Sequence, residues 1–180
     1  ANVYRDEGDE YLIRSEKMTD NVTAVAEFLR KQYAGGGGDT PEAVEVALED
    51  AIENHAWSDE ARSRIVFLVL DAPPHQTPDR LQKIRDLVRK AAEKGIRIIG
   101  LSGSGVDKPT EFLMRYLGLH TGGTYTFLTD HSGIGGSHVE PTIGSHEIEY
   151  LNDLLVRLIV QYTDRPASID DINPRLPAID

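Results

Sequence analysis

Short apolar runs alternate with amphipathic stretches along this chain, and the two patterns predict different elements. The run at 65–70 is apolar on both faces and short, which is typical of a buried parallel strand. The runs at 96–101 and 124–128 predict the next two strands. The segment 11–18 alternates loosely and predicts an exposed strand.

Five amphipathic stretches between these runs predict helices. The first three begin at Asp20, Pro41 and Thr77, which are common residue types at helix N-termini, and the last two cover 109–118 and 145–162. The side chains that we expect to face the core are Val22, Val25, Phe28, Leu29, Val44, Ala47, Leu48, Ala51, Ile52, Leu81, Ile84, Val88, Ala91, Phe112, Leu113, Tyr116, Ile148, Leu151, Leu155 and Leu158.

The alternation of strands and helices predicts the fold class. We expect an α/β domain over residues 1–162, doubly wound, with a mostly parallel sheet and helices on both faces. Residues 163–180 contain three prolines without periodicity and predict a C-terminal extension. Ligands of such sheets bind at the carboxyl ends of the strands, so we expect function after Leu70, Leu101 and Leu128.

Charge and composition exclude several classes of partner. The 180 residues carry a net charge of −11, and residues 1–60 hold 15 acidic against 5 basic side chains. Nucleic acid and anionic membranes are therefore not expected as partners, whereas a cation or a basic partner is favoured. No apolar run approaches the roughly 20 residues of a membrane span. The absence of cysteine excludes thiol chemistry but does not define the compartment, for which extracellular or periplasmic is slightly favoured over cytoplasmic.

Two loops carry candidate chemistry. Asp71 directly follows the strand at 65–70, where a carboxylate can hold a hard cation or simply bond to a loop or cap a helix. The glycines at 35–38 precede Asp39 and Thr40, which form either a binding loop or an ordinary helix start with Thr40 as N-cap. Four consecutive glycines exceed what a cap requires, which favours the binding loop.

Other motifs are weaker. The segment 101–105 follows a strand but fails the P-loop pattern and the nucleophile elbow, although Ser102 with His75 and Asp71 is formally a catalytic triad. A zinc site is another interpretation, with the ligands His131, His138 and Glu140.

The loop GGGGDTPEAV and the strand end DAPPH, about 30 residues apart and in this order, resemble a von Willebrand factor type A domain, most closely its bacterial members. The resemblance covers roughly residues 1–160 and includes the segment VYRDEGDEY. It implies a Rossmann-like α/β domain with a metal-ion-dependent adhesion site for Mg²⁺ or Mn²⁺. By motif, Thr40 and Asp71 are metal ligands, and the ligand-binding loops include Gly37, Gly38, Asp39 and His75.

The resemblance also implies a function and a structural deficit. We expect a binding module that recognises a protein or other ligand whose carboxylate completes the metal shell. The family's Asp-x-Ser-x-Ser loop is missing, so the chain resembles a truncated domain without its first, central strand. A co-purified fragment, a partner chain or a rearranged sheet would then compensate. The alternatives are a hydrolase, metal-dependent or using His75 as base, and a scaffold with a lost metal site.

Overall fold

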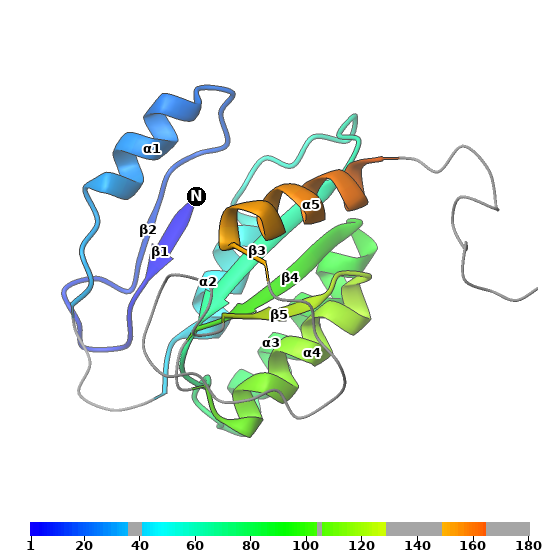
Figure 1. The fold of residues 1–180 in the computed structure, drawn as a ribbon. Coiled ribbons are helices and arrows are strands. Elements are labelled where there is room, and N and C mark those ends of the chain that lie inside the picture. The colour runs from blue at the N-terminus through cyan, green and yellow to red at the C-terminus, as the bar shows by residue number, and fades with distance from the viewer. Residues whose placement is uncertain (36–40, 104–105, 129–148, 165–180) are drawn as a thin grey trace, which may run out of the picture.

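The computed structural model describes residues 1–35, 41–103, 106–128 and 149–164. Ten elements follow one another along these residues (Figure 1). They are β1 (Asn2–Tyr4), β2 (Ile13–Ser15), α1 (Val22–Arg30), α2 (Val44–Glu53), β3 (Arg64–Leu70), α3 (Pro78–Glu93), β4 (Ile96–Ser102), α4 (Lys108–Thr121), β5 (Tyr125–Phe127) and α5 (Leu151–Thr163).

The larger sheet has the order β3-β4-β5 and is parallel throughout. Helices α2, α3 and α4 pack on one face around a core that includes Leu48, Ile84 and Leu117. Helix α5 packs on the other face through Leu154 and Leu158 (Figure 1). The predicted α/β class, with a parallel sheet and helices on both faces, is therefore confirmed.

The smaller sheet is an antiparallel hairpin of β1 and β2, in which Val3 lies opposite Arg14. The exposed strand predicted at 11–18 is present but short, and β1 is an element that the pattern did not predict. In Figure 1, β1 lies between β2 and the larger sheet. Within the described residues the hairpin shares no strand pairing with β3, β4 or β5.

Several boundaries and core positions agree with the pattern. Thr77 caps α3 by accepting a hydrogen bond from the backbone N–H of Arg80, with Pro78 in the first turn. The stripe predicted on α2 is buried: Val44, Ala47, Leu48, Ala51 and Ile52. Glycine at 95 has a φ of +64°, the left-handed conformation that ends α3.

Other core expectations are wrong. The first helix is capped by Asn21 rather than Asp20, and none of its residues is buried. The second begins at Val44 rather than at Pro41. Phe112 is 72% exposed, because it lies on the solvent side of α4, whose buried side carries Leu113 and Met114. On the last helix, Leu158 is buried as predicted and Leu151 packs against the same core, but the second buried residue is Leu154 rather than Leu155. Ile148 lies outside the described residues.

Candidate functional site

The carboxyl ends of β3 and β4 meet at one edge of the parallel sheet, and Asp71 is the first residue beyond β3. Its side chain is exposed and has no hydrogen bond or ion pair to any residue in the described ranges. The backbone N–H of Gly103, just beyond β4, donates to the carbonyl of Leu70 at 2.9 Å. A Cβ on Gly103 would lie 3.1 Å from the Asp71 Cβ, so the glycine leaves room for the carboxylate.

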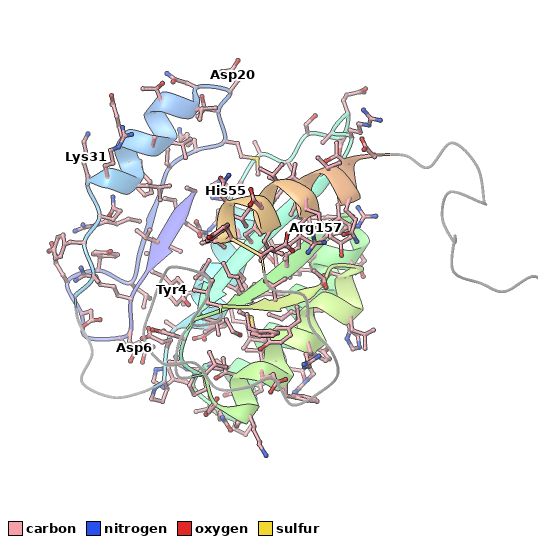
Figure 2. All side chains as sticks on the ribbon, viewed as in Figure 1. Tyr4, Asp6, Asp20, Lys31, His55 and Arg157 are labelled. Carbon is pink, nitrogen blue, oxygen red and sulfur yellow. The ribbon has the colours of Figure 1, made fainter. Side chains whose placement is uncertain are left out.

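Tyr4, the last residue of β1, lies near the same edge and is labelled in Figure 2. Burial raises the pKa of its hydroxyl, and the negative charges of Glu42 and Asp71 raise it further. The backbone N–H of Glu42 donates to the carbonyl of Pro73 at 2.9 Å. The start of α2, the end of β1 and the loop after β3 therefore converge on one acidic corner.

His75 binds Asp6, which lies two residues after β1. Asp6 is labelled in Figure 2. Their Nε2 and Oδ1 atoms are 2.7 Å apart, and the side chains are 21% and 11% exposed. Burial opposes ionisation of Asp6, but the bond to His75, the backbone N–H of Glu7 and the charge of Arg80 outweigh it and lower the pKa of Asp6. The acidic partner of His75 is thus Asp6, not Asp71 as the triad interpretation requires.

Arg80 holds the same corner together from α3. Its guanidinium is 2.9 Å from Oε1 of Glu45 and 2.5 Å from Oε1 of Glu7. Glu45 is 5% exposed, and its other oxygen has no hydrogen-bond partner in the described part of the chain. The charge of Glu45 is therefore compensated mainly by Arg80, which ties α2 to α3 and to the loop after β1.

Ser102, the last residue of β4, is 1% exposed. Its hydroxyl oxygen has no hydrogen-bond partner among the residues that the structure describes. A hydroxyl this deeply buried is closed to substrate in the described structure, and His75 is bound to Asp6. The formal triad of Ser102, His75 and Asp71 is therefore not assembled here.

A hollow of about 420 Å³ lies beside the hairpin. Arg5 lies in it between two aromatic rings, 4.6 Å from the centroid of Tyr11 and 4.9 Å from that of Tyr33. Arg5 also donates to the carbonyl of Tyr33 at 2.9 Å. These contacts engage the guanidinium of Arg5, the one cation among the described residues that line the hollow.

The second loop of the predicted metal site lies outside the described residues, namely Gly37, Gly38, Asp39 and Thr40. The same holds for the alternative zinc ligands His131, His138 and Glu140. Across the ranges that are described, no group of three or more His, Asp or Glu side chains is arranged to hold a metal ion. Of the predicted metal ligands, Asp71 alone is therefore placed, at the strand end where it was expected.

Asp6, Glu45 and Arg80 are the residues of this corner that sequence reasoning missed. Asp6 stands 69 positions before His75, so spacing could not pair them. The cluster of acidic residues at 6–10 was the one available signal.

Two wider findings bear on function. No helix in the described ranges is long and apolar enough to cross a membrane. Comparison with protein-family models and with curated proteins finds no match for this sequence.

Proposed function

We propose that this chain is a binding module that holds Mg²⁺ or Mn²⁺ at the carboxyl end of β3 through Asp71. A protein or other ligand would contribute a carboxylate to the same cation. The observation that carries the proposal is the state of Asp71, an exposed carboxylate at the strand end with no partner in the described chain. The carboxylate of Asp6 is engaged by His75, whereas that of Asp71 has no partner among the described residues.

The electrostatics of the corner support a cation over an anion. Glu42 and Asp71 both act on the Tyr4 hydroxyl, and the chain as a whole carries a net charge of −11. Carboxylate oxygens are the ligands that hard divalent cations prefer. An acidic edge of this kind attracts a cation and repels a phosphate.

The affinity expected for the cation alone is weak. The described residues offer one carboxylate, and the resemblance adds the hydroxyl of Thr40, so water fills most of the shell. We expect a Kd on the order of 10⁻⁴–10⁻³ M, the weak end of the range for oxygen-ligated Ca²⁺. A ligand carboxylate would tighten the site by replacing water.

Calorimetric titration with Mn²⁺ tests the proposal. We expect saturable binding to the unaltered chain and none to Asp71→Asn, which removes the charge but keeps the shape. Asp79→Asn is the matched control, because Asp79 is also an exposed carboxylate but lies in the first turn of α3. Equal binding by the unaltered chain and Asp71→Asn would contradict the role of Asp71. No binding at all would favour the scaffold interpretation.

The hydrolase alternative gains no support from the geometry around His75. Its Nε2 atom is bound to Asp6, and this pair connects the loop after β1 with the loop after β3. Such a connection favours a structural role for the histidine.

A further inference from the structure

A second hollow, of about 390 Å³, lies between α3 and α4, which pack side by side on one face of the sheet (Figure 1). The lining residues of each helix stand three or four positions apart, so each helix turns one side toward the hollow. They include Leu81, Ile84 and Arg85 on α3 and Phe112, Leu113 and Tyr116 on α4. We name this space the interhelix hollow.

The interhelix hollow reaches down to the core. Ile84 and Leu113 are buried and belong to the core beneath the two helices, and the loop after β3 adds the buried Pro74. Arg85 and Phe112 are exposed and stand at the mouth. A concave site of this size, with an apolar floor and few polar groups, is typical of the sites that take small molecules.

Among the described residues that line the hollow, Arg85 alone carries a charge. Its guanidinium donates to the side-chain oxygen of Gln82 in the same helix, at 2.7 Å from Nη2 and 3.2 Å from Nε. Gln82 is neutral, and no carboxylate in the described ranges pairs with Arg85. The positive charge at the mouth is therefore uncompensated.

The other basic side chains of α3 are all paired with carboxylates. The pairs are Arg80–Glu45, Lys83–Glu49, Arg89–Asp86 and Lys90–Glu53. Three of the four partners belong to α2, whereas Arg85 lies on the side of α3 that faces α4. An unpaired guanidinium beside apolar surface suits a carboxylate, which its N–H groups bind as a fork.

Aromatic side chains form part of the wall on α4. Phe112 and Tyr116 stand four positions apart, and both line the hollow. The ring of Tyr116 already contacts that of His120, with 4.1 Å between the centroids, whereas Phe112 has no ring contact in the described ranges. Aromatic rings attract one another in offset or edge-to-face arrangements, so Phe112 favours a ligand that carries a ring.

We propose that the interhelix hollow binds a small aromatic carboxylic acid, with its ring between α3 and α4 and its carboxylate on Arg85. The ring replaces water against Leu81, Phe112 and Leu113, which is favourable because it removes apolar surface from water. The carboxylate compensates the charge at the mouth.

The backbone around the hollow favours a free small molecule over a segment of polypeptide. Both walls are helices, whose backbone N–H and C=O groups bond within the helix. A peptide that entered between them would bury its own N–H and C=O groups without partners. A small aromatic acid has no backbone groups to satisfy.

Chemical-shift titration of the ¹⁵N-labelled chain with indole-3-butyrate tests the proposal, and the neutral indole-3-butyramide is the matched control ligand. The buffer contains no divalent cations, so the outcome is independent of the proposed cation site at Asp71. We expect saturable shifts centred on Leu81, Arg85, Phe112 and Leu113, with a Kd on the order of 10⁻⁴–10⁻³ M for the acid. The amide should bind at least about fivefold more weakly, because it cannot form the charged pair.

Two substitutions separate the role of the charge from that of the ring. Arg85→Gln should weaken binding of the acid at least about fivefold and leave that of the amide within about twofold. Arg89→Gln is the matched control variant and should change neither, because Arg89 is also an exposed arginine of α3 but is paired with Asp86. Phe112→Ala should weaken both ligands at least about threefold and still fold, because Phe112 is exposed.

Several results would overturn the proposal. Absence of saturable binding, or equal affinity for the acid and the amide, would mean that the hollow does not recognise an aromatic acid. Affinity for the acid that Arg85→Gln leaves unchanged would place the carboxylate elsewhere. A peptide with a free C-terminal tryptophan that binds at least about tenfold more tightly than indole-3-butyrate would indicate a chain end as the ligand. Nuclear Overhauser contacts in the unbound chain, between Phe112 or Leu113 and residues outside the described ranges, would mean that the chain fills the hollow itself.

Discussion

The bond between His75 and Asp6 is expected to be a clamp that holds β1 beside β3, because the two strands share no backbone pairing in the described structure. Its removal should destabilise the fold measurably. The perturbation is a double-mutant cycle of Asp6→Ala and His75→Ala, with Asp6→Asn as a variant that removes the charge alone.

The size of the coupling energy between Asp6 and His75 follows from the distance between the two side chains and from their burial. A hydrogen bond to a charged group contributes about 1.5–3 kcal/mol, and exposure reduces this contribution. The two atoms are 2.7 Å apart, and the side chains of His75 and Asp6 are 21% and 11% exposed. We therefore expect a coupling energy of about 1–2 kcal/mol from the cycle at neutral pH.

The pH dependence has a defined sign. The folded-state pKa of Asp6 lies below its unfolded value, so the unfolded state binds the proton more tightly. The contribution of Asp6 is fully present above the unfolded pKa of about 3.9 and is lost as the pH falls through the folded pKa. The free energy of unfolding should therefore fall less steeply at acid pH in Asp6→Asn than in the unaltered chain.

Urea unfolding at a series of pH values measures both the coupling energy and the pH dependence of the free energy of unfolding. Asp20→Asn is the control, because Asp20 is an exposed carboxylate at the far end of the hairpin, beside α1 (Figure 2). This variant should leave the curve unchanged within about 0.5 kcal/mol. A coupling energy near zero would contradict a stabilising bond between Asp6 and His75. So would a free energy of unfolding that falls at acid pH as steeply in Asp6→Asn as in the unaltered chain.

Three further predictions concern stability, each measured by urea unfolding. Arg80→Ala should cost about 3–5 kcal/mol because it leaves the buried carboxylate of Glu45 without its cation, and a loss below 1 kcal/mol would contradict this ion pair. Gly123→Ala should prevent native packing, because the added Cβ would overlap the carbonyl oxygen of Ile98 on β4. An unchanged urea midpoint would show that the backbones at Gly123 and Ile98 are not so close. Phe112→Ala should lower the free energy of unfolding by less than about 1 kcal/mol, and Leu113→Ala by about 2–4 kcal/mol. A larger loss for Phe112→Ala than for Leu113→Ala would mean that Phe112 is a core residue after all.

The larger sheet was predictable because its signals are local. Strand β3 covers the predicted run at 65–70 and begins one residue earlier, at Arg64. Thr77 and Pro78 mark the start of α3 in both the sequence and the structure. Apolar periodicity identifies an element but not its surroundings. Val22 and Leu29 form an apolar side of α1 yet are 78% and 47% exposed, because no neighbour in the described structure buries them.

The site was predictable only in part. Asp71 stands where a strand-end rule places it, which needs no knowledge of other segments. The pairs His75–Asp6 and Arg80–Glu45 join positions 69 and 35 residues apart, and such contacts arise from the topology rather than from any local pattern.

Paramagnetic line broadening by Mn²⁺ of the amide signals of the isotope-labelled chain is the most direct test of the cation site. We expect broadening at low Mn²⁺ to centre on Asp71, Ala72 and Gly103, at the carboxyl ends of β3 and β4, and Asp71→Asn to remove it. Broadening centred on the acidic hairpin or on α2, or broadening that persists in Asp71→Asn, would contradict a cation site at this edge of the sheet.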